Sequence, residues 1–181
     1  MQYKINYKNQ YGGDIKNIIV YCHPKKITME NNNHWMMEIF KEIINDNYPH
    51  DTINFDTIDI LPGGTIQDNV FSQTFINEHA NTYDGIFVPD CAGPWNYLQQ
   101  IANKDDWPNQ TAKNNMLRNM IKNITKMLKP NGILFISKIL TDTFYKIIVD
   151  VLNKLNFEII DKNFILYEES YSSPFIYAIK Q

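Results

Sequence analysis

The chain has 181 residues, of which 44% are hydrophobic and 13% aromatic, and its formal net charge at pH 7 is −3. A chain of this size and apolar content buries roughly two-thirds of its unfolded surface, which excludes an intrinsically disordered protein. The small negative charge, with no basic run longer than Lys25-Lys26, leads us to expect no nucleic-acid-binding patch.

The cysteines and the N-terminal residues bear on location. Cys22 and Cys91 are too few for a disulfide framework, and no Cys/His spacing is typical of a zinc site, so we expect reduced thiols and no metal. Residues 1–14 lack a signal peptide's apolar stretch, and no run of roughly 18 apolar residues could span a bilayer. We therefore expect a soluble cytoplasmic protein; its oligomeric state stays open. The abundant Asn, Ile and Lys suggest an AT-rich genome.

The N-terminal half reads as a strand, a helix, a strand and a second helix. After the extension 1–14, NIIVYCH (17–23) is a short apolar run rich in β-branched residues, typical of a buried parallel strand. HWMMEIFKEIINDN (34–47) has apolar residues at helical spacing, with Asn33 as its N-cap. TINFDTIDIL (52–61) predicts a strand. TIQDNVFSQTFINEHA (65–80) predicts a helix that Thr65 opens as N-cap.

The C-terminal half continues this alternation and then breaks it. YDGIFVPD (83–90) predicts a strand, and a long loop (91–110) leads to a helix that begins at Thr111. We expect Asn131-Gly132 to form the left-handed C-cap of that helix. ILFISKIL (133–140) predicts a strand and residues 141–156 a helix. FEIIDKNFILYEE (157–169) and SPFIYAIK (173–180) predict two strands without a helix between them.

This pattern defines the expected fold class. Strands alternating with helices predict an α/β protein: a three-layer, doubly wound, mostly parallel sheet covered on both faces. The last two strands must form an antiparallel pair, because a short connection does not join parallel strands. We expect one Rossmann-like domain over residues 15–181.

Several stretches of the second half resemble the C-terminal half of class I S-adenosylmethionine-dependent methyltransferases. They are YDGIFVPD, LKPNG (128–132), ILFISKI (133–139), FEIIDKN (157–163) and SPFIYAIK. In that family an Asp opens the fourth strand, Leu-Lys-Pro-Gly-Gly precedes the fifth, and the sixth and seventh strands form a terminal hairpin. The resemblance covers residues 83–180 and implies a methyltransferase-type domain that binds S-adenosylmethionine.

The N-terminal half departs from this family. The family holds its cofactor at a glycine-rich turn after the first strand, where missing side chains let the ligand approach the backbone. Here the first strand ends in Tyr21-Cys22-His23-Pro24, with no glycine from there to Gly63, and only two strands are predicted before 83–90 where the family has three. The resemblance implies an acidic residue on the ribose hydroxyls at the end of the second strand. Asp56 and Asp59 are the candidates, and we assign Asp59.

Other site residues follow from the strand order. Ligands of open α/β sheets bind outside the carboxyl ends of the strands, where the winding reverses. If the methyltransferase order holds, the ends of the first strand and of 83–90 meet there. His23, Asp90, Cys91 and Trp95 would then rim one pocket. Asp90 is the candidate catalytic residue, while Trp95 could stack on an adenine ring.

Two alternatives stay open. NIIVYCHP followed by a polar loop and a helix is similar to flavodoxin-like quinone reductases, in which a strand ending in His-Pro leads to the FMN phosphate site. That resemblance implies an FMN-dependent oxidoreductase. The second alternative is a Rossmann-like binding or assembly module without catalysis, which the missing glycine-rich turn favours.

Overall fold

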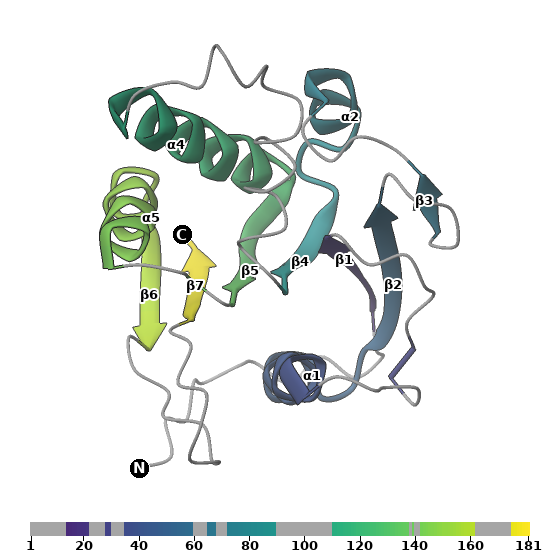
Figure 1. Ribbon diagram of the computed structural model, residues 1–181. Coiled ribbons are helices and arrows are strands. Elements are labelled where there is room, and N and C mark those ends of the chain that lie inside the picture. The colour runs from purple at the N-terminus through teal and green to yellow at the C-terminus, as the bar shows by residue number, and fades with distance from the viewer. Residues whose placement is uncertain are drawn as a thin grey trace.

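The computed structural model describes residues 14–21, 28–29, 35–59, 65–67, 72–89, 110–137, 139, 142–161 and 175–181. A single seven-stranded sheet organises them in the order β3-β2-β1-β4-β5-β7-β6 (Figure 1). The strands are β1 (Ile15–Tyr21), β2 (Thr52–Asp59), β3 (Ile66–Gln67), β4 (Tyr83–Val88), β5 (Leu128–Ile136), β6 (Phe157–Asp161) and β7 (Ile176–Lys180). The helices are α1 (Trp35–Asn47), α2 (Gln73–Glu78), α4 (Gln110–Lys126) and α5 (Asp142–Lys154).

The pairing directions confirm the predicted fold class. Strands β3, β2, β1, β4 and β5 are parallel to one another. Strand β7 pairs antiparallel with both β5 and β6, so the terminal strands form the expected hairpin. A flavodoxin-like sheet has five strands in the order 2-1-3-4-5, and this sheet differs from it by the antiparallel β7 between β5 and β6.

The sheet separates two apolar clusters, which makes three layers. On one face, α2, α4 and α5 pack against the sheet, as in Figure 1, and contribute residues such as Phe75, Ile124 and Ile148. On the other face, α1 contributes Met37, Phe40 and Ile44. Every residue of β4 is buried, as expected for a central strand with helices on both faces.

Strand β3 is absent from the sequence prediction, which placed a helix N-cap at Thr65. The structure instead pairs Ile58 with Ile66 and Asp59 with Gln67 in parallel, so three strands precede β4. A parallel pair normally needs a crossover of a dozen or more residues. Here β3 lies beside the very end of β2. To pair in parallel, the chain only has to come back from the level of Asp59 to the level of Thr57, where Thr65 bonds. That is about two residues, roughly 7 Å along the strand. The helix itself begins later, with Ser72 as the N-cap of α2.

The predicted C-cap at Asn131-Gly132 is also wrong. Helix α4 ends at Lys126, and β5 already includes residue 128. The last carbonyls accept hydrogen bonds from the turn before β4: Asn81 N donates to Lys126 O at 3.0 Å, and Thr82 N to Met127 O at 2.9 Å. Asn131 does have a positive φ of 62°, but it lies in an irregular part of β5. Tyr83 pairs with Leu128 and the next pair is Gly85 with Ile133, so five residues of β5 lie opposite two residues of β4.

None of the helices in the ranges given above is long and apolar enough to cross a membrane. In the same residues, no group of three or more His, Cys, Asp or Glu side chains is arranged to hold a metal ion.

Candidate functional site

The winding of the sheet reverses between β1 and β4. The chain builds β1, β2 and β3 outward in one direction and then continues on the other side of β1 with β4 and β5. In doubly wound sheets this switch point, at the carboxyl ends of the strands, is where ligands bind. The carboxyl edge of this sheet is therefore the candidate functional site.

The strand ends at this edge lie level with one another. Tyr21 pairs with Ile58, and Val88 pairs with Ile136, while Val20 pairs with Phe87 one position earlier. These side chains are all buried. Because the strand ends are buried, a ligand at this edge would be held by the residues that follow them.

Asp59 is the final residue of β2, one position beyond Ile58. Its backbone pairs with Gln67 of β3, and its side chain is half-buried. In dinucleotide-binding sheets an acidic residue that follows the glycine-rich turn by about 20 residues binds the ribose hydroxyls. Asp59 is the one predicted site residue that the structure describes.

Asp56, the other ribose candidate, has a different role. It pairs with Ile19, three residues back from the strand end. Its Oδ2 accepts a hydrogen bond from the Tyr83 hydroxyl at 3.3 Å. Burial, and then the Asp56 carboxylate, raise the pKa of Tyr83 well above its usual value, so the phenol stays protonated and donates. Asp56 therefore ties β2 to the start of β4, three residues away from the end of β2 where Asp59 lies.

A pair of threonines holds the turn between β2 and β3. Thr57 N donates to Thr65 Oγ1 at 2.6 Å, and Thr65 N donates to Thr57 Oγ1 at 3.0 Å. The Thr65 hydroxyl in turn donates to Thr57 O at 3.2 Å. Thr57 is fully buried, and buried backbone groups must be paired to avoid a desolvation cost. This threonine clasp, Thr57 with Thr65, fixes the strand end that carries Asp59.

Ser137 holds the carboxyl end of β4. Its amide donates to Val88 O at 3.0 Å, and its hydroxyl donates to Pro89 O. The serine is fully buried. Since Pro89 directly precedes Asp90 in the sequence, Ser137 fixes the point from which the chain continues to the predicted catalytic residue. The sequence analysis did not identify Ser137 as a supporting residue, although a serine inside the apolar run ILFISKI could have indicated one.

Lys41 of α1 holds the segment after β1. The side chain is buried at 7% exposure, and its Nζ donates to Met29 O at 3.1 Å. Burial lowers the pKa of Lys41, while the nearby Glu38 carboxylate opposes that shift. Sequence analysis missed this lysine too, because one cation in an amphipathic helix normally lies on the solvent side.

The remaining predicted site residues are His23, Asp90, Cys91 and Trp95. All of them lie outside the described residues. The strands that precede them, β1 and β4, are parallel neighbours and end at the same edge. The pocket that these residues would rim therefore stays a prediction.

Polar groups also gather at the opposite, amino edge. Lys129 Nζ lies 2.8 Å from Asp84 Oδ2, which also accepts a hydrogen bond from Asn17 N at 2.9 Å. These contacts join the starts of β1, β4 and β5. They face away from the switch point, so we assign them to stability.

The strand order and the terminal hairpin define the fold. The chain has a class I methyltransferase-like, Rossmann-like fold, as the resemblance of its C-terminal half implied. No protein-family model matches the sequence, and no curated protein matches it.

Solved structures are similar to the chain in fold, at low identity. The N-methyltransferase NodS from Bradyrhizobium japonicum WM9, in complex with S-adenosyl-L-homocysteine, is 13% identical with a TM-score of 0.49, over 93% of this chain and 77% of that one. The antibiotic-resistance methyltransferase Kmr is 11% identical with a TM-score of 0.47, over 92% and 87%. An O-methyltransferase family protein from Burkholderia thailandensis is 10% identical with a TM-score of 0.49, over 92% of this chain and 51% of its own length. The chain thus spans about half of the Burkholderia protein, and 42% of another matched chain.

Proposed function

We propose that the chain binds S-adenosylmethionine at the carboxyl edge of its sheet, with the Asp59 carboxylate on the ribose hydroxyls. The observation that carries this proposal is the position of Asp59 at the end of β2, directly beside β1 in a sheet whose winding reverses between β1 and β4. A carboxylate has two oxygens that accept hydrogen bonds, which suits a pair of neighbouring hydroxyls.

The residues of the chain fit this ligand in three further respects. The threonine clasp holds the end of β2, so that Asp59 does not have to be ordered when the ligand binds. Ser137 fixes the end of β4, from which the sequence continues to Asp90. The chain also places Trp95 five residues after Asp90, and an indole is a suitable stacking partner for adenine.

The reaction proposed for this site is methyl transfer. The bound cofactor would supply a methyl group on a sulfonium. The role proposed for Asp90 is to orient a nucleophile in line with that methyl and to accept its proton. The identity of the methyl acceptor is left open.

The first strand supports a second candidate function, binding without catalysis. His23 and Pro24 stand where methyltransferases have their glycine-rich turn. Side chains there keep a ligand farther from the backbone than glycines would. A domain that holds the adenosine part of the cofactor without aligning its methyl group is the outcome that this feature favours.

The test is a thermal-shift titration with S-adenosylmethionine and S-adenosylhomocysteine. A ligand at 100 times its dissociation constant adds about 2.7 kcal/mol of stability, which raises the midpoint by about 5–10 °C for a chain of this length. Asp59→Asn should abolish most of this rise. Asp56→Asn is the matched control: it weakens the Tyr83 hydrogen bond and should lower the midpoint of the free protein but keep the ligand-induced rise.

Three outcomes separate the candidates. A rise with both ligands that Asp59→Asn removes supports cofactor binding at this edge. If neither ligand moves the wild-type midpoint, the proposal is wrong. If both bind but incubation with a methyl-labelled cofactor leaves no label on the protein or on a cell-extract substrate, the non-catalytic candidate replaces the methyltransferase.

A further inference from the structure

The outward side of α4 carries a row of cations. Arg118, Lys122 and Lys126 are spaced by four residues, which places them along one face of the helix. Lys122 and Lys126 are exposed and Arg118 is half-exposed. The opposite side of α4 is buried in the core through Leu117, Met120, Ile121 and Ile124. The row extends over about 12 Å, at 1.5 Å per residue.

Asparagines lie between these cations. Asn115, Asn119 and Asn123 repeat at the same interval, and all three are at least partly exposed. Arg118 Nη1 donates to Asn115 Oδ1 at 3.3 Å, and Lys126 Nζ donates to Asn123 Oδ1 at 3.0 Å. These six residues, Arg118, Lys122, Lys126, Asn115, Asn119 and Asn123, form what we call the α4 cationic face.

The charge of this face stands out against the rest of the chain. Helix α4 contains no Asp or Glu, although the whole chain carries a net charge of −3. Arg118 is also the only arginine of the sequence. A guanidinium is the side chain best suited to bidentate contact with phosphate. An anion that approaches α4 therefore meets several donors and no carboxylate of the same helix.

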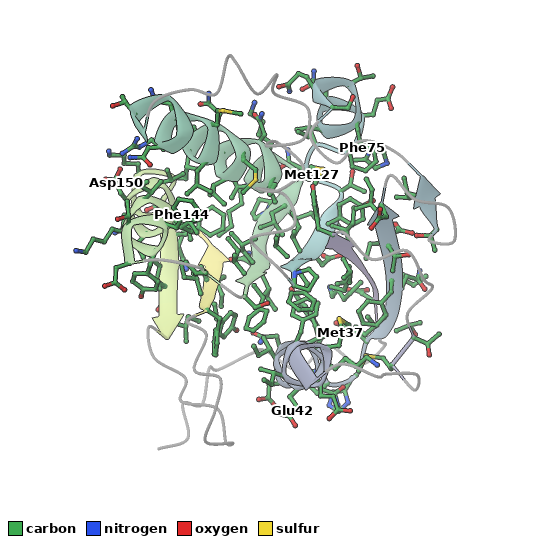
Figure 2. The ribbon with its side chains drawn as sticks, viewed as in Figure 1. Met37, Glu42, Phe75, Met127, Phe144 and Asp150 are labelled. Atoms are coloured by element: carbon green, nitrogen blue, oxygen red, sulfur yellow. The ribbon has the colours of Figure 1, made fainter. Side chains whose placement is uncertain are left out.

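One carboxylate lies at the flank. Figure 2 shows Asp150 where α5 runs beside α4. The hydrogen bond from Lys154, and to a smaller extent the Lys154 and Arg118 charges, lower the pKa of Asp150. The closest partner of Asp150 is Lys154, whose Nζ lies 2.8 Å from its Oδ2. Asp150 thus competes weakly for Arg118 and leaves Lys122 and Lys126 without a carboxylate on their own helix.

We propose that the α4 cationic face binds the phosphate backbone of a nucleic acid. Three cations that project from one face, with interleaved amides that can donate to phosphate and sugar oxygens, match the contacts that position proteins on nucleic acids. An anionic membrane fits less well, because interfacial helices insert an apolar face. The apolar face of α4 is buried, and the large exposed hydrophobic residues of the described ranges, Ile15, Leu155 and Ile160, all lie outside α4. The proposed binding of a nucleic acid to the α4 cationic face is independent of the proposed binding of S-adenosylmethionine at the carboxyl edge of the sheet.

The sequence led us to expect no such patch, since its longest basic run is Lys25-Lys26. That expectation considered only adjacent cations. Cations four residues apart form no run in the sequence, yet a helix of 17 residues collects them on one surface.

The experiment measures fluorescence anisotropy of a labelled 20-base-pair RNA duplex over a salt series. Non-specific binding of this kind has dissociation constants of about 10⁻⁴–10⁻⁶ M at physiological salt, and each phosphate that the protein neutralises adds about 0.9 to the slope of log K against log salt. Lys122→Gln should reduce the slope by about one and weaken binding roughly two- to fivefold. The triple variant Arg118→Gln/Lys122→Gln/Lys126→Gln should weaken it roughly tenfold or more.

The matched control is Lys146→Gln on α5. Lys146 is exposed like Lys122, and the substitution changes the net charge equally, but Asp142 and Asp150 lie four residues before and after it. It should leave the slope unchanged. Asp150→Asn removes the competing carboxylate and should tighten binding, the opposite sign to the lysine variants.

Several results would overturn the proposal. The proposal is wrong if the anisotropy does not change in low salt with the protein in large excess over the RNA. It is also wrong if Lys146→Gln weakens binding and lowers the salt slope as much as Lys122→Gln does. Equal, face-dependent binding to phosphatidylserine vesicles or to polyglutamate would reassign the face to membranes or acidic proteins.

Discussion

Two buried hydroxyl side chains, those of Thr57 and Ser137, shape the carboxyl edge of the sheet. Both are fully buried, and both bond to backbone groups of a neighbouring segment. A hydroxyl can donate and accept at once, so one small residue can satisfy a backbone amide and also hold a chain segment. The candidate ligand residues of this site thus depend on positions that touch no ligand.

Removing the Thr57 hydroxyl should destabilise the protein. Thr57→Val keeps the shape but removes the acceptor of the Thr65 amide at 3.0 Å. Because Thr65 itself is exposed, the cost should be that of one lost hydrogen bond, about 0.5–1.5 kcal/mol. Thr57→Ser keeps the hydroxyl and should recover most of that loss. Urea unfolding of the two variants measures the difference. Equal free energies of unfolding for Val and Ser would show that the hydroxyl contributes nothing.

At the residue scale, the sequence suggests charged candidates for a site but not the residues that support them. Asp59 could be proposed because an acidic residue after an apolar strand is conspicuous. Thr57 and Lys41 could not, since their importance comes from Thr65 and Met29, partners in other segments of the chain. His23, Asp90, Cys91 and Trp95 remain predictions, because the structure describes only the strands that precede them.

At the scale of elements, the irregular start of β5 shows how a turn motif can lie inside a strand. Lys129-Pro130-Asn131-Gly132 has the residues of a helix C-cap, and Asn131 does adopt the left-handed conformation. The carbonyls at the end of α4 are already satisfied by the amides of Asn81 and Thr82. The motif is therefore free to form the bulge that brings β5 into register with β4.

Gly132 should be the residue of this bulge that tolerates substitution least. A Cβ there would lie 2.9 Å from Lys129 O and 3.3 Å from Asp84 O. Backbone atoms cannot move aside, so we expect Gly132→Ala to cost about 2–3 kcal/mol in the free energy of unfolding.

Gly85→Ala in β4 is the control for that substitution. Its nearest neighbour would be Ile18 Cδ1 at 2.7 Å, the far end of a flexible side chain. We expect a loss of about 1 kcal/mol or less there. Denaturant unfolding of both variants checks the order, and a Gly85→Ala variant less stable than Gly132→Ala would contradict it.

The short elements are where sequence reasoning failed. Strand β3 has two residues, too few for any periodicity to appear, and it is defined only by its pairing with β2. The long elements, whose apolar residues repeat over several turns or positions, were predicted with their type correct. The helix expected from Thr65 to Ala80 shortened to α2 because the threonine clasp draws Thr65 into the sheet.

At the scale of the whole molecule, Lys180 ties the end of the described chain to its middle. From β7, its Nζ donates to Leu128 O at 2.6 Å and to Thr125 O at 3.3 Å, and it lies 3.4 Å from Asn81 Oδ1. A cation at the C-terminal end of α4 is also favoured by the helix dipole. The terminal hairpin, α4 and the turn before β4 are thus joined at one ammonium group.

Lys180→Met should lower stability by about 1–2 kcal/mol, because these hydrogen bonds disappear while the length of the side chain is kept. Its effect should depend on pH. Burial lowers the pKa of Lys180 in the folded protein below its ordinary 10.5. At a pH between the folded pKa and the unfolded pKa of 10.5, the unfolded chain therefore binds more protons than the folded one. The stability of the wild type relative to Lys180→Met should therefore increase as pH rises through that window and level off above about 10.5.

Unfolding curves of both proteins from pH 7 to 11 check this sign, and other titrating groups cancel in the difference. A difference that is constant or decreases with pH would contradict the prediction.

The placement of β7 between β5 and β6 has a consequence for the order in which the sheet can be assembled. Among the residues that the structure describes, β6 pairs only with β7, which follows it in the chain. During synthesis, β6 must wait unpaired until the later strand has emerged and docked on β5. Completion of the sheet is thus a late, long-range event, which slows folding and leaves an open strand edge exposed to other chains in the meantime.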